Sequence, residues 1–330
     1  MTTSLRTDRL ASGGRRRSEP APAETPGVST ATSAAAPKRR MAYILSPSYS
    51  GSTLLTFLLA GHPGIATIGE LKATHMGDID QYRCSCGELI RVCPFWRRLT
   101  DLVRQRGGEF DVADFGTHFR FPGRPLGDRV VRTRVRNRLF ESVRRTALQV
   151  VPPWRRSFRA VLEQNARLVE AVMALQGGEV FLDASKDTNR LRFLLDAGLW
   201  DLKVIYMIRD GRGAANSFMR HHGVPMAVAA REWRTTHQEC DRLVAGLPLD
   251  SVTTLHYEQL CEAPDAETAR IPGSSASTPR WRQATVGPPS TTSSATRCGC
   301  VPPARSGWTR SGGLPSRPRS SPPSVASPRT

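Results

Sequence analysis

The chain has 330 residues, 39% of them hydrophobic, which suffices for one large α/β domain or two small ones. Its formal net charge of +18 comes mostly from the two ends: residues 1–40 hold eight basic against three acidic side chains, and residues 266–330 hold nine against one. No apolar run approaches the roughly 18 residues of a membrane span, and no secretory signal is visible. We therefore expect no membrane span and a cytoplasmic location.

Both ends have the composition of disordered chain. Residues 1–40 are rich in Arg, Ser, Ala and Pro, and residues 266–330 in Ser, Thr, Pro, Gly and Arg. Such segments bury too little apolar surface to offset the entropy of ordering them. We expect a disordered tail at each end, a folded domain over residues 41–265, and an insert over residues 70–155 that shapes the acceptor side.

Hydrophobic periodicity predicts five strands that alternate with helices. The expected strands are residues 41–46, 65–68, 179–183, 202–208 and 251–256. The expected helices are residues 52–60, 156–176, 187–197, 212–222 and 225–246. This alternation predicts an α/β fold with one parallel sheet and helices on both faces.

The loop after the first strand consists of small and hydroxyl-bearing residues. It contains Ser48, Tyr49, Ser50, Gly51, Ser52 and Thr53, and it opens a helix. Backbone N–H groups and the helix dipole bind anions at such a helix start. The loop lacks the Gly-Lys-Ser/Thr ending of a Walker A loop. The alternative is an ordinary strand-to-helix turn.

A second junction of the same kind follows the strand at residues 202–208. Arg209 comes directly after that strand, and Asp210, Gly211 and Arg212 lead into a helix that carries Ser217. Two phosphate-binding junctions on one sheet suit a ligand that has phosphates at both ends.

These two motifs resemble those of the sulfotransferases that use 3′-phosphoadenosine 5′-phosphosulfate. That family has a Pro-Arg-Ser-Gly-Thr-Thr loop for the 5′-phosphosulfate and an Arg-Asp-Pro-Arg…Ser segment for the 3′-phosphate. Pro47 with residues 49–53 is similar to the first, and residues 209–212 with Ser217 are similar to the second. The resemblance spans residues 41–262 and includes the tyrosylprotein and carbohydrate branches and their bacterial relatives.

The resemblance implies a P-loop nucleotide-kinase-like fold and transfer of a sulfuryl group to a hydroxyl or amine. The acceptor would be a small molecule, a sugar or a peptide, and no metal is required. Lys186 is similar to a family lysine that stabilises the leaving phosphate; the alternative is a solvated lysine. Tyr49 departs from the family, which has Arg or Lys there, so Lys186 is left as the expected cation.

A hydroxyl acceptor must lose its proton as it attacks sulfur, so a base must lie within hydrogen-bond reach. Glu70 follows the strand at residues 65–68 and is similar to the glutamate base of the tyrosylprotein branch. His62 is the rival, although its position predicts a helix cap. The alternative for Glu70 is a surface carboxylate.

Three of the seven cysteines are close in sequence, at Cys84, Cys86 and Cys93. An odd number without a signal peptide indicates reduced thiols. The three could hold zinc if His75 or a carboxylate completed the ligand shell, but the usual two-residue spacing is missing. We therefore expect no metal. If a metal does bind, these three thiols are the candidate ligands.

Residues 120–159 hold twelve arginines against two acidic residues. Such a segment could attract nucleic acid, an anionic membrane or an acidic acceptor, and a solvated basic helix is the simpler alternative. No aromatic-rich basic face accompanies it, so we expect no specific nucleic-acid partner. Two other functions stay open: a P-loop small-molecule kinase, and a basic nucleic-acid-binding protein on an α/β scaffold.

The resemblance ends abruptly after residue 262. Family members continue with apolar helices and a basic loop that closes over the nucleotide, whereas this chain continues with the low-complexity segment. We expect a frameshift near residues 270–280, which would leave the nucleotide lid incomplete and impair the enzyme.

Overall fold

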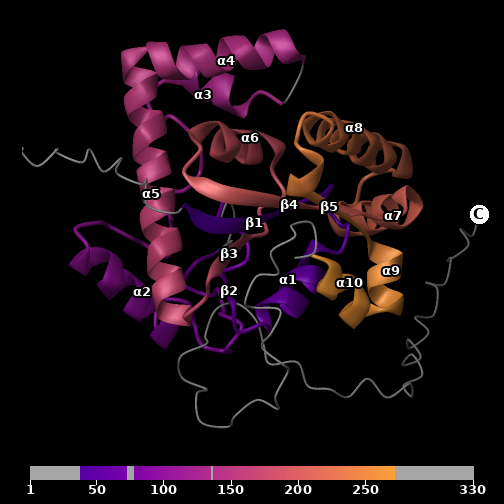
Figure 1. The fold of residues 1–330 in the computed structure, drawn as a ribbon, viewed down its shortest axis with the longest axis horizontal. Coiled ribbons are helices and arrows are strands. Elements are labelled where there is room, and N and C mark those ends of the chain that lie inside the picture. The colour runs from indigo at the N-terminus through magenta and orange to yellow at the C-terminus, as the bar shows by residue number, and fades with distance from the viewer. Residues whose placement is uncertain (1–37, 73–77, 135–136, 272–330) are drawn as a thin grey trace, which may run out of the picture. The chain divides into compact units, whose positions relative to one another are not determined.

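Five parallel strands form one sheet in the order β2-β3-β1-β4-β5 (Figure 1). In this computed structural model the strands are β1 (Arg39–Leu45), β2 (Ile65–Thr67), β3 (Val180–Asp183), β4 (Trp200–Ile208) and β5 (Val252–His256). Each expected strand is present, displaced by no more than two residues at its ends. The predicted α/β fold with a parallel sheet is therefore confirmed.

The structure describes residues 38–72, 78–134 and 137–271. The segments 1–37 and 272–330, which contain most of the two expected tails and the suspected frameshift, lie outside the described residues, as does His75. Arg39 and Arg40, assigned to the amino-terminal tail, belong to β1, and their guanidinium groups form ion pairs with Glu170 and Glu179 at 3.4 and 3.6 Å. At the other end a helix runs to Arg270, past the expected boundary at residue 265.

Ten α-helices accompany the sheet in the described part of the chain. They are α1 (Ser52–Ala60), α2 (Pro94–Gln105), α3 (Pro125–Arg132), α4 (Arg138–Val150), α5 (Pro152–Gln176), α6 (Thr188–Ala197), α7 (Gly211–His222), α8 (Met226–Val244), α9 (Tyr257–Glu262) and α10 (Pro264–Arg270). The sequence pattern predicts α1 and α5 to α8. It misses α2, α3 and α4, which lie in the insert, and α9 and α10, which are only six and seven residues long.

The alternation of side chains along the strands divides the core between the two faces of the sheet. In β1, Met41, Tyr43 and Leu45 join the larger apolar cluster, and Ile44 joins the smaller one. The larger cluster includes residues of α5, α6, α8 and the insert, whereas the smaller includes residues of α1 and α9. Figure 1 shows α6 and α8 above the sheet and α1, α9 and α10 below it. Helices on both faces are what the pattern of buried strands predicts.

The strand order creates a switch point at β1. From β1 the chain crosses to β2 and β3 on one side and later to β4 and β5 on the other. In open parallel sheets, ligands bind beyond the carboxyl ends of the strands at such a point, because the loops diverge there and leave a crevice. The switch point therefore lies between the first predicted phosphate loop, after β1, and the second, after β4.

A buried ion pair ties the insert to the sheet. Asp183, at the end of β3, is fully buried and accepts a 2.8 Å hydrogen bond from Nε of Arg190 in α6. Nη1 of Arg190 donates to the carbonyl of Thr117 in the insert, and Nη2 donates to the side chain of Asn165 in α5. Four parts of the chain thus meet at one guanidinium group, and each of its three nitrogen atoms donates to a buried partner, as a stable buried charge requires.

We predict that Arg190→Met lowers the free energy of unfolding by about 3–5 kcal/mol, because the Asp183 carboxylate is left buried and uncompensated. Arg104→Met is the matched control: Arg104 forms an exposed pair with Asp101 at 3.6 Å, and exposed pairs contribute under about 1 kcal/mol. Chemical denaturation of both variants measures the difference. Equal losses in the two would contradict the structural role of the buried pair.

Candidate functional site

Residues with polar, charged or aromatic side chains follow the carboxyl ends of all five strands, at one edge of the sheet. The loop at residues 46–51 follows β1, Glu70 follows β2, Lys186 follows β3, Arg209 follows β4 and Tyr257 follows β5. Four of these were predicted as site residues from the sequence. Tyr257 was noted only as part of a motif, and its contacts emerge from the fold.

The start of α1 is built like an anion site. Gly51 is its N-cap at φ 88°, and no side chain caps the helix, so the first-turn N–H groups lack a side-chain acceptor. The hydroxyl oxygens of Ser46 and Ser50 are buried without a hydrogen-bond partner among the described residues. Buried polar groups without partners are costly and rare. Hydroxyl donors and uncapped N–H groups fit a phosphate or sulfate, which offers acceptors only.

The segments that follow β1, β4 and β5 pack around one aromatic ring, that of Tyr257 at the start of α9. A Cβ atom placed on Gly51 would lie 2.2 Å from the ring of Tyr257, so only glycine fits there. The guanidinium carbon of Arg209 lies 4.4 Å from the centroid of the same ring, and Nη1 of Arg209 donates a 2.8 Å hydrogen bond to the carbonyl of Tyr49. Arg209 therefore joins the two predicted phosphate loops.

Arg209 has spare capacity for an anion. No carboxylate forms an ion pair with it within the described ranges, whereas the neighbouring Arg212 pairs with Asp210 at 2.7 Å and has a side chain that is 93% exposed. The hydroxyl of Ser217 donates at 3.0 Å to the carbonyl of Gly213, and a Cβ on Gly213 would lie 3.3 Å from Nε of Arg209. Arg209 and Ser217 thus both lie beside Gly213.

Tyr49 contacts α7 through its side chain. Its hydroxyl lies 3.1 Å from Nε2 of His222, and its ring packs against Phe218 and His221. Partial burial raises the pKa of the Tyr49 hydroxyl, so it stays neutral at physiological pH. A tyrosine side chain is never cationic, so Tyr49 supplies no positive charge to the loop in either protonation state. The two histidines beside it were not singled out from the sequence.

Glu70 and Lys186 form an ion pair between the ends of β2 and β3, although 116 positions separate them. The Glu70 side chain is 46% exposed and that of Lys186 is 22% exposed. Lys186 has φ 61° and Tyr49 has φ 64°, and these are the non-glycine residues with positive φ in the described chain. Backbone strain of this kind concentrates at functional sites. The predicted base and the predicted cation are therefore neighbours in a strained part of the edge.

Asp183 positions the Glu70–Lys186 pair through the backbone of the neighbouring residues. Its Oδ1 accepts hydrogen bonds from the backbone N–H groups of Leu71 and Ser185, which are the residues next to Glu70 and Lys186. The Ser185 hydroxyl in turn accepts a 2.9 Å hydrogen bond from the N–H of Lys72. Both catalytic candidates are thus held through their neighbours by one buried carboxylate, a role that the sequence pattern did not reveal.

A second ion pair, between Lys72 and Asp187, adjoins the first. Burial by itself would raise the pKa of Asp187, but the Lys72 ammonium and the hydrogen bonds from Lys72 and Arg190 outweigh it and leave that pKa lowered. His118, from the insert, faces these charges. Burial and the Lys72 charge lower the pKa of His118 to about 4, so it is neutral at physiological pH. Sequence reasoning passed over all three residues.

The rival base, His62, lies at the other edge of the sheet. It follows the carboxyl end of α1 and precedes β2, and its Nδ1 accepts a 3.1 Å hydrogen bond from the N–H of Gly64. Because α1 carries the chain back from the carboxyl edge, His62 is separated from the loop at residues 46–51 by the length of that helix. The C-cap of α1 is Gly61, so His62 follows the cap and does not itself fill the cap position that was expected for it.

The basic segment at residues 120–159 folds mainly into α3, α4 and the start of α5. Arg144 is buried and pairs with Glu141, and its Nη1 donates at 2.8 Å to the carbonyl of Thr133. Arg134 pairs with Glu232 of α8. The segment is therefore not uniformly a solvated helix, because part of its charge is used in packing the insert against the domain.

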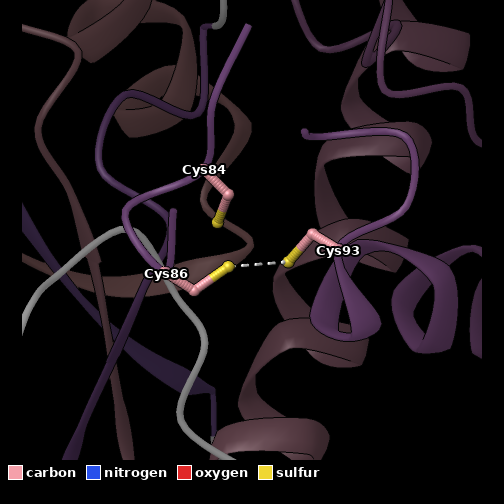
Figure 2. A group of neighbouring side chains, drawn as sticks. All are labelled: Cys84, Cys86 and Cys93. Carbon is pink, nitrogen blue, oxygen red and sulfur yellow. Dashed lines mark hydrogen bonds between the residues drawn. The ribbon is translucent and has the colours of Figure 1, made fainter. Parts of the chain in front are cut away.

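The cysteine cluster lies in the insert, apart from the residues described above. Figure 2 shows Cys84, Cys86 and Cys93 converging. The Sγ atoms of Cys86 and Cys93 are 3.6 Å apart.

No helix in the described ranges is long and apolar enough to cross a membrane.

No protein-family model matches the sequence, and no curated protein matches it. Three solved structures are similar to the chain. The sulfotransferase domain of the Synechococcus PCC 7002 olefin synthase is 20% identical over 72% of this chain and 73% of that chain, with a TM-score of 0.37. A sulfotransferase domain of the curacin biosynthetic pathway is 15% identical, covering 80% and 84%, with a TM-score of 0.40.

The third is a sulfotransferase from Mycobacterium avium, 16% identical over 72% of this chain and 64% of that chain, with a TM-score of 0.40. Likeness at this level supports no conclusion about what the chain does. The function has to be inferred from the chain's own residues.

The pKa of His118 generates a prediction for stability. Its pKa in the folded protein, about 4, lies below the ordinary value of about 6.5. Between these two pH values His118 binds a proton in the unfolded chain but not in the folded chain. The free energy of unfolding therefore decreases as pH falls from about 6.5 towards about 4. We predict that His118→Gln loses less stability than the wild type over this range, as measured by chemical denaturation. Identical pH profiles would contradict the lowered pKa of the half-buried His118.

Proposed function

We propose that the chain is a sulfotransferase that moves a sulfuryl group from 3′-phosphoadenosine 5′-phosphosulfate to a hydroxyl or amine of a small-molecule, sugar or peptide acceptor. One observation carries the proposal. Arg209, an arginine without an ion-pair partner among the described residues, donates a hydrogen bond to the loop that opens the uncapped helix α1. Two anion-binding elements are thereby joined at one edge of the sheet, which suits a nucleotide with phosphates at two positions.

The donor would use both elements. The first-turn N–H groups of α1 and the unpartnered hydroxyls of Ser46 and Ser50 would take the 5′-phosphosulfate, with Ser48, Ser52 and Thr53 in the same loop. Arg209 and Ser217 would take the 3′-phosphate. The guanidinium group suits this role because it binds phosphate in a bidentate manner.

The chemistry would fall to the ion pair. An acceptor oxygen attacks the sulfur atom, the bond from sulfur to the bridging phosphate oxygen breaks, and the acceptor proton passes to Glu70. The products are the sulfated acceptor and 3′-phosphoadenosine 5′-phosphate. Lys186 donates to the bridging oxygen as negative charge builds there. Because Tyr49 is neutral, Lys186 is the cation in this scheme.

The pairing of the two residues couples these events. While Glu70 is ionised, its carboxylate holds the Lys186 ammonium. When Glu70 takes the acceptor proton, that attraction disappears, and the strongest remaining acceptor for Lys186 is the leaving oxygen. Proton uptake and stabilisation of the leaving group would therefore occur together.

We predict that Arg209→Ala weakens binding of 3′-phosphoadenosine 5′-phosphate by about 1.5–3 kcal/mol, the value of a charge-assisted hydrogen bond. Binding of adenosine 5′-phosphate should change far less, because it lacks the 3′-phosphate. Isothermal titration calorimetry measures both.

Arg212→Ala is the matched control, since it removes the same charge three residues away, at the start of α7, from an exposed side chain paired with Asp210. Equal weakening of both nucleotides by Arg209→Ala would contradict the assignment to the 3′-phosphate. Tighter binding of magnesium ATP than of the bisphosphate nucleotide would favour the kinase alternative instead.

We predict that Glu70→Gln lowers turnover by roughly 10²–10⁴-fold, because it keeps the shape of the side chain but removes the base. Binding of the bisphosphate nucleotide should be nearly unchanged. Turnover is measured as nucleotide release from the phosphosulfate donor with a panel of hydroxyl and amine acceptors. Glu109→Gln, at an exposed position of the insert, is the control, and a Glu70→Gln enzyme as active as this control would exclude Glu70 as the base.

A further inference from the structure

The local fold brings three thiols together from two directions. Cys84 and Cys86 lie on a tight turn in which the N–H of Gly87 donates to the carbonyl of Cys84 at 2.8 Å, and the N–H of Cys84 donates to the carbonyl of Glu88 at 2.8 Å. Cys93 is the N-cap of α2, and its N–H donates to the carbonyl of Leu89. Backbone hydrogen bonds therefore hold both arms of the cluster.

The sulfur positions match a tetrahedral metal. All three Sγ atoms lie within 4.8 Å of one another, and those of Cys86 and Cys93 are 3.6 Å apart. At a Zn–S distance of about 2.3 Å, two thiolates on a tetrahedral zinc are about 3.8 Å apart. A zinc ion thus needs only small shifts of these side chains, each of which points towards the same point in Figure 2. None of the three is in a disulfide.

The surroundings of the cluster favour deprotonated thiols and leave one side of the cluster open to solvent. Cys93 sits at the positive end of the α2 dipole, which stabilises a negative ligand. Cys84 and Cys93 are buried, whereas Cys86 is exposed. The cluster therefore opens to solvent on one side, where water can complete the four-coordinate shell that zinc requires.

We propose that Cys84, Cys86 and Cys93 bind one zinc ion through three thiolates, with water as the fourth ligand. Binding forms three Zn–S bonds and releases the three thiol protons to solvent, so no oxidant or reductant is needed. The ion fastens the turn at residues 84–87 to the start of α2.

The site supports the core beneath the proposed active edge. Cys84 and Cys93 belong to the same apolar cluster as Leu71, which directly follows Glu70. Thr117, in the next part of the insert, donates its hydroxyl to the carbonyl of Leu71. A metal at the cysteines therefore stabilises the part of the insert against which the Glu70 segment packs, without touching the reacting groups.

The test uses the full chain, reduced and handled without oxygen, and Zn²⁺ or Co²⁺ as the probe. We expect one zinc per chain by elemental analysis, a thiolate-to-cobalt charge-transfer band on titration with Co²⁺, and a higher melting temperature with zinc than after chelation. Cys86→Ser is the informative variant, because the exposed position places folding at least risk. Its affinity for zinc should fall by more than about tenfold, since even residues outside the ligand shell have effects of that size.

Two controls remove three of the four thiols outside the cluster and leave the buried Cys240 in place. Cys261→Ser changes an exposed cysteine outside the cluster, and a double Cys298→Ser, Cys300→Ser variant changes the remaining close pair in the sequence. Both should keep the zinc and the charge-transfer band. The proposal is overturned if the reduced chain takes up no metal, if the control variants lose it, or if Cys86→Ser binds zinc as tightly as the wild type. It is also overturned if Cys86 and Cys93 form a disulfide that persists under reducing conditions.

Discussion

The proposed active edge depends on one buried carboxylate. Asp183 is fully buried and is balanced by the guanidinium group of Arg190. Its other oxygen accepts from the backbone of Leu71 and Ser185 and so sets where Glu70 and Lys186 emerge. A buried ion pair adds little to stability compared with apolar packing, and its value lies in specifying one arrangement. Here that arrangement brings a base and a cation together across two strands.

The other half of the edge is held by close packing around Tyr257. Its ring lies between Gly51 and the guanidinium group of Arg209, so the loops after β1, β4 and β5 have one mutual position. Both non-glycine residues with positive φ in the described chain, Tyr49 and Lys186, are at this edge. Strain, unpartnered buried hydroxyls and an arginine without a carboxylate partner coincide where a polyanionic ligand would offset all three.

The insert is held by contacts of two kinds. Near the edge of the sheet, the Arg190 guanidinium group donates a hydrogen bond to the carbonyl of Thr117. Within the insert, the thiols of Cys84, Cys86 and Cys93 converge where the turn at residues 84–87 meets the start of α2. The arginine-rich segment contributes further ion pairs, such as that of Arg134, between α3 and α4, with Glu232 of α8. Part of the charge that could have attracted nucleic acid is therefore used in holding the insert in place.

By itself the sequence determined the five strands and the helices α1 and α5 to α8, and it predicted the two loops that are proposed to bind phosphate, because these follow from local periodicity and from small residues after an apolar run. It could not determine the strand order, so the pairing of Glu70 with Lys186 came only with β2 beside β3. Nor could spacing reveal that Asp183 needs Arg190 or that Gly51 needs the ring of Tyr257. The close spacing of Cys84, Cys86 and Cys93 made them candidate ligands, but only the fold shows that their Sγ atoms converge. The packing of the whole domain decides which of these contacts form, because spacing along the chain does not fix where side chains meet.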